Sequence, residues 1–120
     1  MNRMKRVSLK ELQELAKEKG NGVPLPKSQR EKFYHSGAWE KLREQVLDRD
    51  GHECCVCRQQ GRLTGYWDSR LIVHHMHVLE YFPKLAYDID NLITVCIKCH
   101  NDIHGYNVPI NKKKWDDEFF

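Results

Sequence analysis

The stretch "IVHHMHVLE" (residues 72–80) contains three closely spaced histidines, and its interpretation decides the rest of the fold. Together with the residues before it, this stretch predicts a strand over "SRLIVHH" (residues 69–75). Side chains alternate between the two faces of a strand, so His75 and His77 would lie on one face and His74 on the other. The three histidines therefore cannot all bind one metal ion unless the strand is broken. One of His74 and His75 can bind a metal while its neighbour points towards a substrate.

A second strand and a short helix are predicted downstream, over "NLITVC" (residues 91–96) and "KCHNDIHG" (residues 98–105). Gly105 fits the end of that helix, because glycine tolerates the left-handed conformation that closes many helices. His100 and His104 are one helical turn apart and would point the same way. That spacing suits two ligands of one metal ion. The alternative is that these histidines form a polar surface.

Two C-x-x-C pairs predict a zinc site: Cys54 with Cys57, and Cys96 with Cys99. Two such pairs, separated by a loop-rich stretch, suit a tetrahedral site of four thiolates. The alternative is four buried, reduced cysteines. Cys55 does not fit the spacing, although it could replace Cys54 if the register of the first pair slipped. Zinc would supply folding free energy that a small apolar core lacks.

Two helices are predicted before the cysteines. Ser8 and Glu11 form a capping-box pattern at the start of an amphipathic helix that Gly20 would end. A second helix is expected from Ser36, its N-cap, to Asp50, because apolar residues recur on one face between them.

The chain is predicted to divide into three parts. The stretch "GNGVPLPKSQ" is rich in glycine and proline and is typical of a linker, which makes residues 1–29 an N-terminal helix and linker appendage. The core domain would then span residues 30–107. The last residues, 108–120, would form a solvated C-terminal tail.

Composition narrows the class of protein. Of the 120 residues, 31% are charged and 40% are hydrophobic, which supports one small folded core. The net charge of +3 permits an anionic partner without requiring one. The chain has no apolar run long enough to span a membrane and no apolar signal segment at its start. We therefore expect a cytoplasmic protein without a membrane partner, in which reduced cysteines bind metal.

The motifs together resemble a known family. "VHHMHVLE" followed by "DNLITVCIKCHNDIHG" is similar to the motif of the HNH endonucleases, which have the ββα-metal fold. The upstream stretch "FYHSGAWEKLREQVLDRDGHECCVC" resembles small phage enzymes encoded beside the packaging terminase. The resemblance covers residues 30–105 and departs at His77 and Val78, where the family often has an aliphatic residue and a proline. It implies an α+β fold: a small zinc-stapled ββα-metal domain with additional N-terminal helices.

The resemblance also implies roles for single residues. His75 would be the general base that takes a proton from the attacking water. His74 and His100 would hold a catalytic divalent cation (Mg²⁺, Mn²⁺, Co²⁺ or Ni²⁺), with His104 as a third ligand. Asn91 would tie the loop so that His75 is aimed correctly.

The implied function is that of a metal-dependent DNA endonuclease. It would hydrolyse phosphodiester bonds, nicking or cutting double-stranded DNA with low sequence specificity, in support of phage genome packaging in the host cytoplasm. Terminase or portal proteins are the expected protein partners. DNA contacts are expected from nearby cationic side chains, with these candidates: Arg43, Arg62, Arg70, Lys98 and Lys112 to Lys114. The alternative function is that of a zinc-stapled DNA-binding accessory module without cleavage activity.

Overall fold

The fold is α+β, as predicted, and the computed structural model describes residues 7–20 and 22–105. Lys112 to Lys114 and the rest of the expected tail, residues 108–120, lie outside this part of the chain. No helix in the described part is long and apolar enough to cross a membrane. The elements are, in chain order, α1 (Leu9–Ala16), α2 (Lys27–Tyr34), α3 (Gly37–Arg49), α4 (Cys55–Gln59), β1 (Leu71–His75), η1 (Pro83–Leu85), η2 (Ile89–Asn91), β2 (Leu92–Cys96) and α5 (Ile97–His104).

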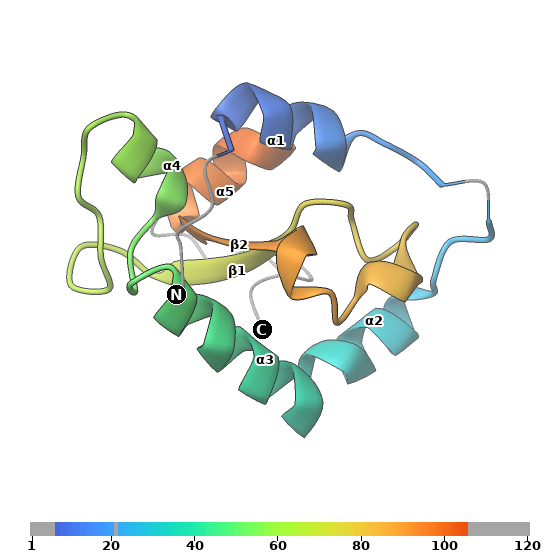
Figure 1. Ribbon diagram of the computed structural model, residues 1–120. Coiled ribbons are helices and arrows are strands. Elements are labelled where there is room, and N and C mark those ends of the chain that lie inside the picture. The colour runs from blue at the N-terminus through green and yellow to red at the C-terminus, as the bar shows by residue number, and fades with distance from the viewer. Residues whose placement is uncertain (1–6, 21, 106–120) are drawn as a thin grey trace.

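An antiparallel hairpin of β1 and β2 forms the centre of the molecule. The register pairs Leu71 with Cys96 and His75 with Leu92. Every residue of both strands is buried, because α3 packs against the hairpin and α5 follows β2 back against it. Figure 1 shows α3 on one side of the hairpin and α5, covered by α1, on the other. Both predicted strands and the helix after them are therefore confirmed.

Helix α3 matches the helix predicted from Ser36 to Asp50. The Ser36 hydroxyl accepts a hydrogen bond from the backbone N–H of Trp39 at 3.2 Å, which satisfies one of the free donors at the start of the helix. Trp39 and Val46 lie on the face of α3 that is buried against the hairpin. The apolar spacing in the sequence therefore correctly identified the inner face of this helix.

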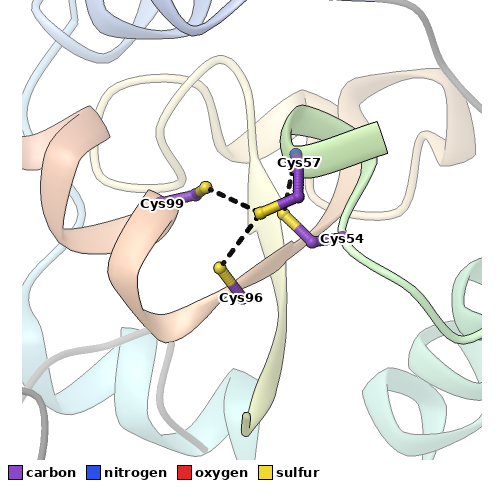
Figure 2. A group of neighbouring side chains, drawn as sticks. All are labelled: Cys54, Cys57, Cys96 and Cys99. Carbon is purple, nitrogen blue, oxygen red and sulfur yellow. Dashed lines mark hydrogen bonds between the residues drawn. The ribbon is translucent and has the colours of Figure 1, made fainter. Parts of the chain in front are cut away.

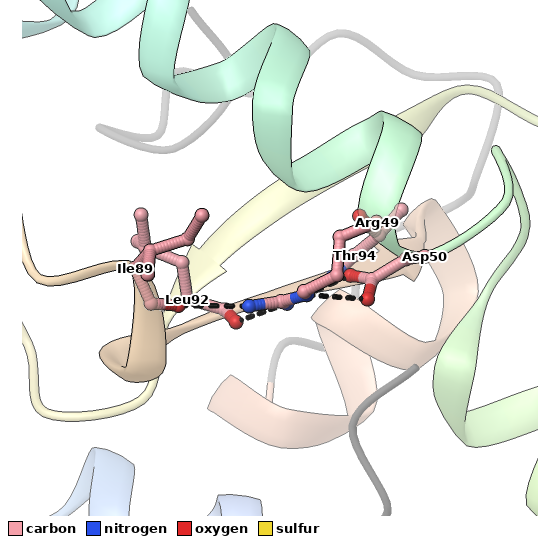
Figure 3. A network of polar contacts seen from close by, with 5 residues as sticks. All are labelled: Arg49, Asp50, Ile89, Leu92 and Thr94. Atoms are coloured by element: carbon pink, nitrogen blue, oxygen red, sulfur yellow. Dashed lines mark hydrogen bonds and ion pairs between the residues drawn. The ribbon is translucent and has the colours of Figure 1, made fainter. Parts of the chain in front are cut away.

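A buried ion pair connects the end of α3 to the second strand (Figure 3). The guanidinium of Arg49 donates to both carboxylate oxygens of Asp50, at 2.8 and 3.0 Å. It also donates to the backbone carbonyls of Ile89 and Leu92, at 2.8 and 2.6 Å. Asp50 in turn accepts from the backbone N–H of Thr94 at 2.9 Å. The pair thus fixes η2 and the start of β2 relative to α3.

The chain between α1 and α3 differs from the predicted linker. The linker was expected to extend to residue 29, but α2 begins at Lys27, directly after Pro26. Proline is well suited to the entry of a helix, because its φ is already fixed near the helical value. Its missing N–H costs nothing there, since the first N–H groups of a helix have no partner within the helix. The prolines of the stretch therefore mark the start of a helix as well as a loop.

Helix α1 lies directly on α5, although the sequence suggested an appendage. Leu12 is fully buried, and the side-chain amide of Gln13 donates to the backbone carbonyl of Asp102 at 2.9 Å. The following segment runs along the loop after β1, where a Cβ on Gly20 would lie 2.6 Å from the carbonyl oxygen of Tyr81. The N-terminal segment therefore braces both the last helix and that loop.

Candidate metal and catalytic centre

Four cysteines from three elements meet at one end of the hairpin. Cys54 precedes α4 and Cys57 lies in it, whereas Cys96 ends β2 and Cys99 lies in α5. Their sulfurs all lie within 4.8 Å of one another, and Cys57 Sγ is 3.8 Å from Cys96 Sγ and 3.6 Å from Cys99 Sγ (Figure 2). Two sulfurs bound to one zinc at about 2.3 Å in a tetrahedron lie roughly 3.8 Å apart. The donor set and its spacing fit a zinc ion.

The four sulfurs share their protons unevenly. Hydrogen bonds from Cys54 and Cys99 lower the pKa of the Cys96 thiol to about 2. The hydrogen bond to Cys96 is the main cause that raises the pKa of Cys54 to about 12, and burial also raises it. The guanidinium of Arg62 lies 3.8 Å from Cys57 Sγ, where it faces the anionic cluster. The lowered pKa of Cys96 favours the thiolate, which is the form that binds zinc, and zinc binding would release the protons of the other thiols.

Cys55 does not belong to the cluster. It is fully buried, and burial, followed by the charge of Asp50, raises the pKa of its thiol. A thiol that remains protonated is a poor metal ligand. The structure thus brings together the four cysteines of the two C-x-x-C pairs and leaves Cys55 out.

Three histidines form a second cluster on the face of the hairpin covered by α5. One ring nitrogen each of His74, His100 and His104 lies within 4.8 Å of the others. The ring centroids are 5.6 Å apart for His74 and His100, 5.1 Å for His74 and His104, and 4.6 Å for His100 and His104. His74 and His100 are fully buried and His104 is half-buried. Three imidazoles fit a borderline divalent ion and leave coordination positions for other ligands.

Helix α5 carries ligand candidates for both clusters. Cys99 and His100 are adjacent, and neighbouring residues on a helix point about 100° apart. The two side chains can therefore serve different sites while sharing one backbone. Gly105 ends the helix in the left-handed conformation, with φ of 70°, as the sequence predicted.

His75 lies on the other face of β1, among aromatic side chains of α2 and α3. Its ring stacks on Trp39, with centroids 5.2 Å apart and planes at 20°, and only 1% of the residue is exposed. His75 Nε2 lies 3.1 Å from the backbone carbonyl of Ala86, and Nδ1 lies 3.2 Å from the hydroxyl of Tyr34. Both ring nitrogens are thus engaged.

The partners of His75 define its tautomer. A carbonyl oxygen can only accept a hydrogen bond, so Nε2 must carry the proton that faces Ala86. In the neutral ring Nδ1 is then the acceptor, and the Tyr34 hydroxyl donates to it. The lone pair of His75 that can take up a proton is therefore the one that faces Tyr34.

Asn91 links the end of η2 to the turn after β1. Its side-chain oxygen accepts from the backbone N–H of His77 at 2.8 Å, and its amide donates to the carbonyl of His77 at 3.1 Å. Its own carbonyl accepts from the N–H of Met76 at 2.8 Å. These three bonds hold the backbone that immediately follows His75.

The remaining candidates belong to neither group of potential metal ligands. His77 Nδ1 is 3.3 Å from a carboxylate oxygen of Glu18, so this histidine joins neither group of ligands. Among the proposed DNA contacts, Arg43 is half-buried, whereas Arg70 and Lys98 are exposed.

Tyr34, which contacts His75, is the residue of this centre that was not predicted from the sequence. It lies 41 positions before His75, and no local pattern joins the two residues. The aromatic residues of "FYHSGAW" were the available signal. They indicate a cluster, but not that the cluster surrounds His75.

The fold and the two clusters define a small α+β domain with two groups of side chains that could hold metal ions, one of four cysteines and one of three histidines. Residues 54–105 match the family model of the HNH endonucleases. With the cysteine cluster, this match fits a zinc-binding HNH domain, a type of domain found in nucleases.

Two further comparisons add little. Anaredoxin from Nostoc sp. (strain PCC 7120 / SAG 25.82 / UTEX 2576) is 25% identical over 71 residues, which are 59% of this chain and 82% of the anaredoxin. This likeness alone assigns no activity to the chain. No solved structure matches it.

Proposed function

We propose that this protein is a metal-dependent DNA endonuclease of the HNH type, which hydrolyses phosphodiester bonds. The proposal depends most on the opposite orientations of two neighbouring histidines at the end of β1. His74 turns towards the imidazole cluster of α5, while the next residue, His75, turns to the opposite face as a neutral imidazole in a defined tautomer. A metal-ligand set and a base, contributed by adjacent residues of one strand, supply two functions that hydrolysis of a phosphodiester uses.

The chain's own residues supply the base and its orientation. His75 takes the proton of the attacking water at Nδ1, because Nε2 donates to Ala86. Asn91 holds the backbone after His75 and so limits the directions in which the ring can point. A divalent ion held by His74, His100 and His104 would supply positive charge for the phosphate and the departing 3′ oxygen.

The proposed substrate is double-stranded DNA with little preference for sequence. Arg43, Arg70 and Lys98 are the candidate contacts to the phosphate backbone, and such contacts position DNA without reading its bases. The resemblance of residues 33–57 to phage enzymes encoded beside the terminase supports a role in genome packaging. That role would have terminase or portal proteins as partners in the host cytoplasm.

Nicking of supercoiled plasmid tests this function. The protein is incubated with plasmid and Mg²⁺, Mn²⁺, Co²⁺ or Ni²⁺ in turn, with and without excess chelator. We expect conversion to the open-circular or linear form with at least one ion and none in chelator. If no ion supports cleavage by zinc-loaded protein, the proposed activity is wrong.

One observation favours a second candidate, a zinc-stapled DNA-binding module without cleavage. His75 is almost completely buried, and both of its nitrogens already have hydrogen-bond partners. A structural histidine would look the same. The two functions differ in what replacement of His75 does: a binding module would keep its DNA affinity and have no nicking activity to lose.

A further inference from the structure

We propose that the hydroxyl of Tyr34 is the proton relay between the attacking water and His75. The inference rests on the proposed nuclease function and adds to it a residue from α2, far from the HNH match in sequence. Its basis is the hydrogen bond between the Tyr34 hydroxyl and Nδ1 of His75, at 3.2 Å between buried groups.

In the part of the chain that the structure describes, both ring nitrogens of His75 face protein groups. Nε2 is occupied by the carbonyl of Ala86, and Nδ1 by Tyr34. One face of the ring is covered by Trp39, which stacks at 20°, and only 1% of His75 is exposed. The Tyr34 hydroxyl, which contacts Nδ1, is therefore the group placed to pass a proton to His75.

The hydroxyl of Tyr34 is suited to this task because it can donate and accept at once. Its ring is held edge-on to Trp39, with centroids 5.3 Å apart and planes at 82°, and edge-on to Phe33 at 5.2 Å and 79°. Both residues are buried, Tyr34 at 5% and His75 at 1% exposure, so the hydrogen bond between them is shielded from bulk solvent. A phenylalanine would fill the same space in this aromatic cluster, so the hydroxyl is the part that packing does not explain.

The water gives a proton to the oxygen of Tyr34 while the phenol proton passes to Nδ1 of His75, which becomes an imidazolium. The water oxygen forms a bond to phosphorus, and the bond between phosphorus and the 3′ oxygen breaks, with the electron pair leaving on that oxygen, which then takes a proton from solvent. The imidazolium donates from both nitrogens, and its neighbours, Tyr34 and the Ala86 carbonyl, can both accept.

The test compares Tyr34→Phe with Tyr87→Phe in the plasmid-nicking assay. Both variants lose one hydroxyl from the same cluster, since Tyr87 also packs on Phe33, at 5.1 Å, but Tyr87 is 55% exposed. Loss of general acid–base function costs about 10²–10⁴-fold in rate. We expect Tyr34→Phe to lower kcat by at least the smaller of these factors with KM for plasmid unchanged, and Tyr87→Phe to match the wild type.

Two further measurements separate relay from packing. In a double-mutant cycle, groups that act in series are strongly non-additive, so Tyr34→Phe should cost nothing in a His75→Gln background. In ¹⁵N spectra of histidine-labelled protein, the Nδ1 signal of His75 should shift in Tyr34→Phe and stay in place in Tyr87→Phe.

The outcomes distinguish the relay from the function on which it rests. Wild-type kcat in Tyr34→Phe, or independent losses that add in the cycle, would overturn the relay and leave the nuclease function standing. If the wild-type protein failed to nick plasmid with every divalent ion tested, both the relay and the nuclease function would be overturned.

Discussion

The cysteine cluster and the histidine cluster both take residues from α5, but they differ in how many ligands they offer to a metal ion. The four sulfurs come from α4 and the residue before it, from β2 and from α5; all four cysteines are buried, and their spacing suits a tetrahedral zinc site. The three imidazoles come from β1 and α5, and one of them, His104, remains half-buried. A zinc ion bound by the four sulfurs would have no position left for substrate, whereas an ion bound by the three imidazoles would have one.

The difference shows how one short helix can combine stability with chemistry. A closed thiolate site cannot activate water, so its effect is to hold α4 against the start of α5. An open imidazole site contributes less to the fold but leaves room for a reacting group. Because Cys99 and His100 are adjacent, a zinc ion at the cysteines would also fix the backbone that orients His100.

The largest effect is expected from breaking the closed site. Cys96→Ser should abolish zinc binding and cooperative folding, because a structural zinc contributes about 10–16 kcal/mol of binding free energy in small domains. Cys55→Ala, a buried cysteine outside the cluster, is the matched control and should keep its zinc. Zinc stoichiometry and thermal melting measure both. The opposite pattern, with zinc lost only in Cys55→Ala, would mean that the assigned register of the first pair is wrong.

A smaller loss, confined to the chemistry, is expected from the base. His75→Ala would also leave a cavity beside Trp39, since His75 is buried and stacked, so His75→Gln is the better variant. We expect it to slow nicking by about 10²–10⁴-fold with DNA binding retained. His77→Gln, at a half-buried histidine outside both clusters, should nick at the wild-type rate. Equal activity of the two variants would remove His75 from the mechanism.

Leu12→Ala tests whether the N-terminal helix belongs to the fold that supports the histidine cluster. Leu12 is fully buried where α1 packs on α5, and such truncations cost about 2–5 kcal/mol. Val23→Ala is the control, because Val23 is 91% exposed and its loss should change little. Chemical denaturation measures the free energy of unfolding. Equal stability of the two variants would show that residues 1–29 are an appendage.

The smallest effect concerns the polar network between α3 and β2. Arg49→Lys keeps the charge but loses the fork that reaches Asp50 and the carbonyls of Ile89 and Leu92. We expect a loss of about 1.5–3 kcal/mol in the free energy of unfolding, the usual size for hydrogen bonds to a charged group. Arg58→Lys is the control, because Arg58 pairs with Glu53 from a largely exposed side chain. If both substitutions cost the same, the network does not stabilise η2 and β2.

The parts of the molecule that could be predicted are those encoded by local spacing. The alternation around His74 and His75 predicted that they lie on opposite faces of a strand, and the one-turn spacing of His100 and His104 predicted that they lie together. The structure confirms both arrangements. The spacing of Cys54 and Cys57 is equally local. Because a zinc ion is commonly bound by two such pairs, the sequence also predicted that this pair meets Cys96 and Cys99.

The parts that could not be predicted depend on contacts between distant segments. The partners of His75 lie on α2, α3 and the loop before β2, and Tyr34 is 41 positions away. The docking of α1 on α5 likewise follows from burial of Leu12 and not from any pattern near the linker. Glycine and proline gave only local information there, which is why residues 27–29, the start of α2, were taken for part of the linker.

The most direct test of the two-site account measures zinc and nicking in the same chelator-treated sample. We predict that brief chelation removes the ion of the open histidine site and abolishes nicking, while one zinc per chain and the melting temperature are retained. Addition of Mn²⁺, Co²⁺, Ni²⁺ or Mg²⁺ alone should then restore activity. Loss of nicking only in proportion to loss of zinc, with recovery by zinc alone, would contradict the account, because one metal site would then serve both the fold and the chemistry.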